Sequence, residues 1–114
     1  MSKRNINLYL EDIRGAIEKI EDYTRGLTYE KFRKADQTIE AVMLNLMVIG
    51  EAASHIPTEF KERYQDIPWG DIVGMRNNIV HAYFGIVVEV VWETIQEDLP
   101  QLKKIMEKLK SASV

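Results

Sequence analysis

The sequence predicts an all-α protein, an antiparallel bundle of four to five helices in one domain that spans residues 1–114. Apolar residues recur at three- and four-residue steps along most of the chain, which is the period of a helix with one buried face. Strand-like alternation is not found over a useful length, apart from a β-branched run at 87–91. With 46% hydrophobic and 29% charged residues over 114 positions, the chain can build a single core.

The first predicted helix runs from about Asn7 to Arg25, where the apolar residues share one helical face. Gly26 follows directly, and a glycine in left-handed conformation ends many helices. Thr28 is then expected to cap a short helical turn that reaches Phe32, because its hydroxyl can accept a hydrogen bond from a free backbone N–H.

The second long helix is predicted over residues 37–54, with Asp36 before it. Its apolar face is wide, which indicates packing on two sides: Ile39, Val42, Met43, Leu46, Met47, Ile49 and Gly50. Pro57 ends this helix, since the residue before a proline is pushed away from helical backbone angles. Thr58 is expected to cap the short charged segment 59–66.

Two further helices complete the predicted bundle. Pro68 is expected near the first position of a helix that carries Asp71 in its first turn. The last helix is predicted over residues 87–110. Pro100 must either kink this helix or restart it after Leu99, because proline lacks the N–H that a helix interior uses.

The helix that follows residue 68 contains an unusual mixture of residues, GMRNNIVHAYFG at 74–85. On a helical wheel at about 100° per residue, one face is apolar and is predicted to join the core: Ile72, Met75, Ile79 and Ala82. Arg76, Asn77 and His81 share the opposite arc, and Tyr83 returns to the Arg76 side two turns along. Three apolar residues lie on the same arc: Val73, Val80 and Phe84. This mixture indicates an interface or a cleft. A guanidinium, an imidazole and an amide are the groups needed to act on a phosphodiester without a metal.

At these residues the sequence resembles the HEPN superfamily, and within it the HepT-like toxins of the MntA/HepT toxin–antitoxin systems. Residues 76–83, RNNIVHAY, match the Arg-x-x-x-x-His-x-Tyr motif of that family. Other segments resemble the family in the same order: NLMVIGEAA at 45–53, IPWGDIVGMRN at 67–77, Trp92 and DLPQL at 98–102. The resemblance covers nearly the whole chain.

The resemblance implies an all-helical homodimer whose two motif helices face each other across the two-fold axis and cleave RNA without a metal. It also implies a partner antitoxin, an MntA-like nucleotidyltransferase that adds AMP to the motif tyrosine, Tyr83. An isologous dimer suits the chemistry, because one motif histidine cannot act as base and acid at separate positions, whereas two can.

We expect His81 to move a proton during attack of a ribose 2′-OH on the adjacent phosphate, and Arg76 to stabilise the charge that develops on the phosphate oxygens. Asn77 is expected to orient either His81 or the phosphate. An AMP group on Tyr83 would place a phosphate beside Arg76 and exclude that of the substrate. Taken singly, these residues have simpler interpretations: a hydrogen-bonded core histidine, a surface ion-pair arginine and a packed tyrosine ring.

Two further residues lie toward the C-terminal end of the second long helix, Glu51 and His55. Glu51 is expected either to pair with Arg76 or to orient His81, and a solvated or capping glutamate is the simpler alternative. His55, at the C-terminal end of the same helix, is expected to interact with the helix dipole.

Composition narrows the function classes. The net charge of −3 argues against a general nucleic-acid coating protein, so an RNA must meet a local basic site. The chain has no cysteine and no cluster of metal ligands, so no metal, cofactor or disulfide is expected. No signal peptide or membrane-spanning segment is predicted, and we expect a cytoplasmic protein. Two competing interpretations are a noncatalytic helical module that binds a nucleotidyltransferase, and a plain structural bundle.

Overall fold

The computed structural model describes residues 5–76 and 88–112, and every regular element within them is helical. The predicted fold class is therefore confirmed. The elements follow one another along the chain: α1 (Ile6–Thr24), α2 (Tyr29–Phe32), α3 (Asp36–Ser54), α4 (Thr58–Arg63), a helical stretch at 69–76, α6 (Val88–Glu93), a π-helical turn η1 (Thr94–Asp98) and α7 (Leu99–Ala112).

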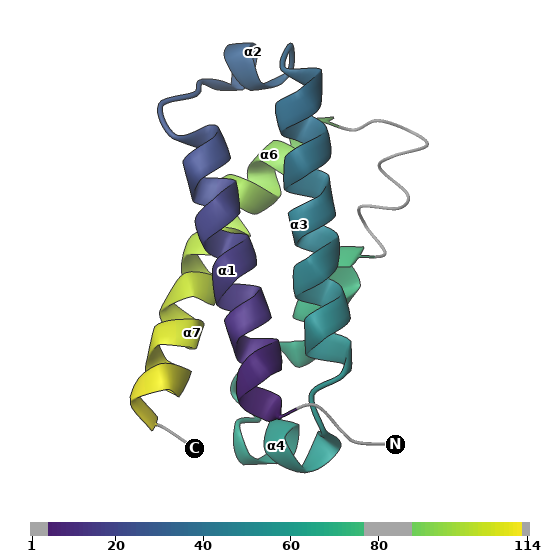
Figure 1. The fold of residues 1–114 in the computed structure, drawn as a ribbon, viewed down its shortest axis with the longest axis vertical. Coiled ribbons are helices and arrows are strands. Elements are labelled where there is room, and N and C mark those ends of the chain that lie inside the picture. The colour runs from purple at the N-terminus through teal and green to yellow at the C-terminus, as the bar shows by residue number, and fades with distance from the viewer. Residues whose placement is uncertain (1–4, 77–87, 113–114) are drawn as a thin grey trace.

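An antiparallel pair, α1 and α3, forms the centre of the bundle (Figure 1). The continuous run α6–η1–α7 crosses the other side of α1, antiparallel to it. The short helices α2 and α4 close opposite ends of the bundle. The core is built from side chains that are at most 1% exposed on each long helix, among them Ile13, Leu46 and Met106. Each such side chain contributes about 1.5–3 kcal/mol of burial free energy.

Both short helices are fixed by one buried aromatic ring. Phe32 of α2 and Phe60 of α4 are at most 1% exposed. As predicted, the side chain of Thr28 caps α2, and Gly26 adopts a left-handed φ of 77° after α1. The predicted cap at Thr58 is wrong, because Thr58 is the first residue of α4, which has no side-chain cap; Asp36 likewise lies inside α3 as its first residue.

Pro100 is accommodated without a break in the last helix. The N–H of Leu99 donates to the carbonyl of Thr94, five residues back, so the chain makes one wide π-helical turn just before the proline. The wide turn shifts the hydrogen-bond pattern by one residue directly before Pro100, the position at which a regular helix loses one hydrogen bond because proline has no N–H. The β-branched run at 88–91 is helical as well.

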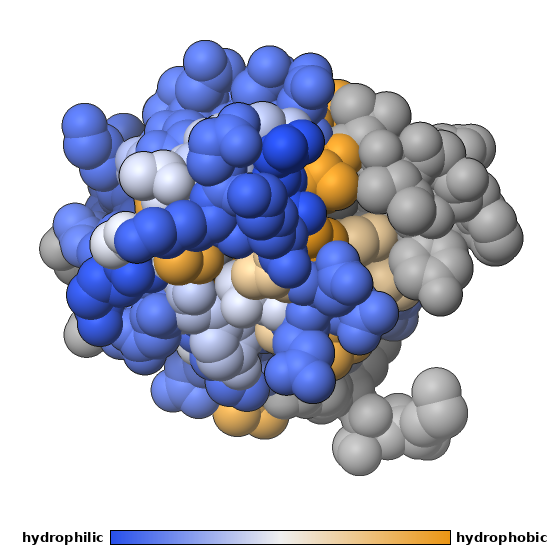
Figure 2. All heavy atoms as spheres, turned by 90° about the horizontal axis from the view of Figure 1, so that it is seen from above, coloured by the Kyte–Doolittle hydropathy of each residue, from blue (hydrophilic) through white to orange (hydrophobic). Residues whose placement is uncertain are grey.

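The apolar face of α3 is not fully covered by the described chain. Met47 is 39% exposed and its neighbour on the same ridge, Leu44, is 61% exposed. The prediction that Met47 packs in the core is therefore wrong for a single chain, because residues 44, 47 and 51 share the outward side of the helix. Viewed from the α2 end, the surface is otherwise mostly hydrophilic, with apolar atoms exposed in a few places (Figure 2).

An ion pair joins the last helix to the first. Lys103 of α7 donates to Glu21 of α1 at 3.0 Å, and this hydrogen bond raises the pKa of the lysine. Both side chains are partly exposed to solvent, so the pair contributes little to stability.

Candidate active site

The helical stretch 69–76 carries the first residue of the predicted motif, Arg76. Its start is anchored by Trp69, whose side chain is 9% exposed and whose indole N–H donates to the carbonyl of Tyr64 at 3.1 Å. The predicted core face is confirmed at Ile72 and Met75, which are 3% and 8% exposed. Ile72 and Met75 point into the core. Arg76 is the next residue on the helix, so its side chain points to one side of the core and lies at the edge of the contact with α3.

Gly50 allows this stretch to touch α3. A β-carbon at Gly50 would lie 2.9 Å from the backbone N and the Cβ of Arg76, and 3.0 Å from the carbonyl of Val73. No side chain fits in that space. The bare backbone at residue 50 therefore brings Arg76 within reach of the last turn of α3.

Two side chains of that last turn bind the Arg76 guanidinium. Its Nη1 donates to Oε2 of Glu51 at 2.8 Å and to Oγ of Ser54 at 3.3 Å. The Ser54 hydroxyl in turn donates to the Glu51 carbonyl at 2.6 Å, which fixes its orientation. The Arg76 side chain stays 36% exposed.

Only one nitrogen of the guanidinium is used in these contacts. Within residues 5–76 and 88–112, neither Nε nor Nη2 of Arg76 has a hydrogen-bond partner. These two nitrogens form one edge of the planar fork, and such an edge binds two oxygens of a phosphate side by side. Glu51 and Ser54 thus hold the arginine through Nη1, and none of the described residues uses its phosphate-binding edge.

The same carboxylate also contacts His55, the residue that follows α3. Nε2 of His55 lies 3.5 Å from Oε1 of Glu51, and the imidazole stacks on the ring of Tyr9 with centroids 5.6 Å apart. Of the two roles expected for Glu51, the structure shows the pairing with Arg76. The contributions of Ser54, His55 and Tyr9 were not predicted. Residues 51, 54 and 55 are spaced three and four apart, and this spacing is the sequence signal that groups them on one helical face.

The other site residues predicted from the sequence, Asn77, His81 and Tyr83, lie outside the described residues, as do the core positions Ile79 and Ala82. Of the predicted set, Arg76 and Glu51 are among the described residues, and the structure brings these two together.

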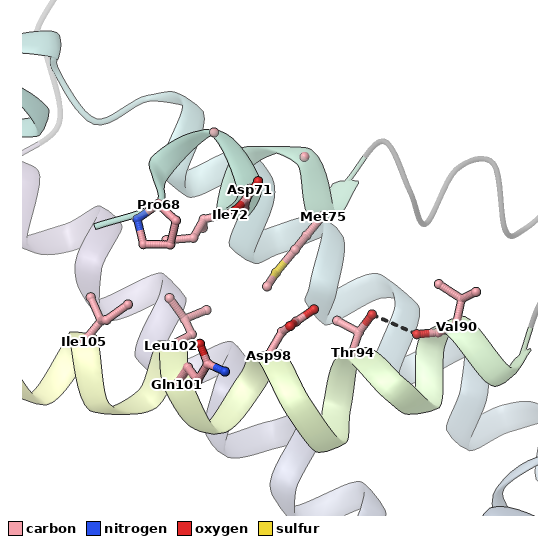
Figure 3. A pocket seen from close by; sticks show the side chains of 12 residues that line it. Pro68, Asp71, Ile72, Met75, Val90, Thr94, Asp98, Gln101, Leu102 and Ile105 are labelled. Atoms are coloured by element: carbon pink, nitrogen blue, oxygen red, sulfur yellow. Dashed lines mark hydrogen bonds between the residues drawn. The ribbon is translucent and has the colours of Figure 1, made fainter. Parts of the chain in front are cut away.

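A cavity of about 490 Å³ lies on the other side of the 69–76 stretch, between it and the η1–α7 run (Figure 3). Asp71 and Asp98 line it, and no lysine, arginine or histidine is among its described lining residues. A phosphate would be repelled there. The described lining does not include Arg76, so this cavity is distinct from the Arg76 site.

Within residues 5–76 and 88–112, no group of three or more His, Asp or Glu side chains is arranged to hold a metal ion. None of the helices in these ranges combines the length and the apolar character needed to cross a bilayer.

Comparison with known proteins gives a consistent family. The family described as "Ribonuclease HepT-like" matches residues 13–109. A protein of Thermococcus cleftensis named "Probable ribonuclease HepT" is 46% identical over 108 residues, which cover 95% of this chain and 98% of that protein. A protein of Methanocaldococcus jannaschii named as a candidate RNase is 36% identical over 107 residues, 94% of this chain and 98% of its own length.

A third relative, from Caldanaerobacter subterraneus and also named as a candidate RNase, is 38% identical over 96 residues, 84% of this chain and 86% of that protein. No solved structure matches the chain. The family match spans most of the sequence, and the relatives are aligned over nearly their full lengths. This chain belongs to the HepT-like ribonuclease family.

Proposed function

We propose that this protein is a metal-independent endoribonuclease and the toxin of a toxin–antitoxin pair. The observation that carries the proposal is the state of Arg76: one nitrogen is fixed by Glu51 and Ser54, and no residue of 5–76 or 88–112 binds the opposite edge of the guanidinium, which has the geometry to bind a phosphate. The family assignment supports RNA as the source of that phosphate.

The proposed reaction is an internal transfer within RNA. The 2′-oxygen of a ribose attacks the adjacent phosphorus, the bond to the 5′-oxygen of the next nucleotide breaks, and a 2′,3′-cyclic phosphate and a 5′-hydroxyl are formed. His81 takes the proton from the 2′-OH, and His81 of the partner subunit gives a proton to the departing 5′-oxygen. Arg76 binds the oxygens on which negative charge develops, with Asn77 orienting the phosphate or the imidazole.

A homodimer is part of this proposal. Leu44 and Met47 are exposed on the side of α3 that also carries Glu51. Exposed apolar side chains beside a charged site are typical of a surface that is covered by a partner. If the two-fold axis of such a dimer passes close to Glu51, the second copy brings its own Arg76 and His81 to the same cleft.

Regulation is proposed to occur at Tyr83. A cognate MntA-like nucleotidyltransferase transfers AMP from ATP to the tyrosine oxygen, with release of pyrophosphate. The phosphate that is added takes the available edge of Arg76 and so competes with the substrate.

The test of this function is cleavage of RNA in excess EDTA. Purified protein, shown by mass spectrometry to carry unmodified Tyr83, is incubated with total cellular RNA beside a His81→Ala variant. We expect cleavage by the parent alone, with 2′,3′-cyclic phosphate at the new 3′ ends. Equal cleavage by both proteins would show that His81 is not catalytic. No cleavage by either would favour the noncatalytic module that binds a nucleotidyltransferase.

The regulatory proposal predicts the behaviour of a Tyr83→Phe variant. Phenylalanine keeps the ring and removes the oxygen that accepts AMP, so the variant should stop growth even when the antitoxin is co-expressed. Colony counts with and without antitoxin measure this, and the parent protein, whose toxicity the antitoxin should relieve, is the control. If the antitoxin rescues the Tyr83→Phe strain as well as the parent strain, Tyr83 is not the point of regulation.

A further inference from the structure

The imidazole of His55 is held in one orientation although most of it is accessible. One face stacks on the ring of Tyr9, with the two planes 17° apart, and its Nε2 points toward Glu51 at 3.5 Å. The His55 side chain is nevertheless 56% exposed. Because the contacts come from two different helices, the ring is fixed in advance of any binding event.

This ring and the Arg76 guanidinium share one partner, Glu51. His55 and Arg76 contact different oxygens of one carboxylate, Oε1 and Oε2 of Glu51. A single carboxylate therefore bridges the imidazole and the guanidinium. A single nucleotide presents the same pair of chemical groups, a flat base and a charged phosphate, joined by its sugar.

We propose that His55, supported by Tyr9, is a stacking platform for an unpaired RNA base whose neighbouring phosphate is bound by Arg76. This inference rests on the proposed ribonuclease function and adds a subsite to it. RNA-binding proteins recognise single-stranded segments by stacking splayed bases on aromatic side chains, histidine among them. The base forms the third layer of a stack that begins with Tyr9.

The platform gives the site a preference for unpaired RNA. In a duplex each base is already stacked and paired, and it must be extruded before its face can reach the His55 ring. Stacking uses only the flat face of the His55 ring, and every base has such a face.

Binding of a non-cleavable RNA tests the platform. The probe is a fluorescein-labelled, single-stranded 2′-O-methyl RNA oligonucleotide, which lacks the attacking hydroxyl, and its Kd is measured by fluorescence anisotropy. His55→Ala should bind about tenfold more weakly than the parent, whereas His55→Phe, which keeps a flat ring and loses the nitrogen that faces Glu51, should bind within about threefold of it. Tyr23→Ala removes another aromatic side chain of α1, 43% exposed and near the opposite end of that helix, and should leave the Kd unchanged.

A series of oligonucleotides with one abasic position locates the base. In the parent protein, the abasic site at one position should weaken binding about tenfold, and in His55→Ala the same oligonucleotide should cause no further loss. If the abasic site and His55→Ala each weaken binding independently, the base at that position does not stack on His55. An unchanged Kd for His55→Ala, or a His55→Phe variant as weak as His55→Ala, would overturn the stacking role.

The binding and cleavage assays separate this inference from the proposed function. If the parent cleaves RNA and His55→Ala binds the probe as tightly as the parent, the ribonuclease proposal stands and the platform is wrong. If the parent neither binds nor cleaves RNA, both fall together.

Discussion

Replacement of Arg76 by alanine is expected to lower the rate of RNA cleavage about 10³-fold and to leave the fold intact. The variant removes the guanidinium that Glu51 holds in place. The negative charge that develops on the phosphate oxygens then loses the group that would bind two of them side by side. The ion pair itself is partly exposed and contributes at most about 1 kcal/mol to stability. Single-turnover cleavage in EDTA and thermal unfolding measure the two effects.

A control and a conservative variant sharpen this test. Arg25 makes a similar 2.8 Å contact with Asp22 on α1 but lies far from α3's last turn, so Arg25→Ala should cleave RNA at the parent rate. Arg76→Lys keeps the charge and loses the fork, and a lysine cannot bind Glu51 and a phosphate through two separate edges; we expect it to retain only a small part of the activity. A folded Arg76→Ala variant that cleaves within about threefold of the parent would contradict the role of Arg76 in charge stabilisation.

The helices could be predicted from the sequence because their signals are local. The end of α1 at a left-handed Gly26 and the cap of α2 by Thr28 each depend on a few neighbouring residues. The π-helical turn before Pro100 could not be chosen over a kink or a restart, because proline excludes a regular helix without specifying what replaces it. Met47 was misassigned because periodicity gives the direction of a side chain and does not show what lies opposite it.

The candidate site could be predicted only in part, for a similar reason. Helical spacing placed Arg76 on a polar arc, and the structure adds the partner from α3 that fixes it. The charge of Arg76 is compensated, since Glu51 and Ser54 bind the guanidinium and the side chain is 36% exposed. The His55–Tyr9 stack joins two helices distant in sequence, and no local pattern indicates such a contact.

Gly50 should be the most sensitive position outside the catalytic residues, because it controls how closely the 69–76 stretch approaches α3. In Gly50→Ala the new methyl group meets two backbone atoms, N of Arg76 and O of Val73, at 2.9 and 3.0 Å, and backbone cannot turn aside as a flexible side chain can. We expect overpacking of about 1–3 kcal/mol to outweigh the gain of up to about 1 kcal/mol that alanine brings to a helix. Thermal unfolding should show a Tm lower by about 4 °C or more.

The rate of RNA cleavage by Gly50→Ala should fall by more than the loss of folded protein alone would cause. The shift that relieves the clash moves Arg76 away from Glu51, and a misplacement of about 1 Å at a catalytic group reduces rates about 10²-fold. Gly15→Ala is the matched control, because this glycine also lies inside a long helix, α1, yet a β-carbon there meets nothing within 4 Å. That variant should be stabilised by about 0.5–1 kcal/mol and cleave RNA at the parent rate. Equal changes in Tm and rate for the two variants would mean that the close approach at Gly50 does not position Arg76, and that the guanidinium is held by its polar contacts alone.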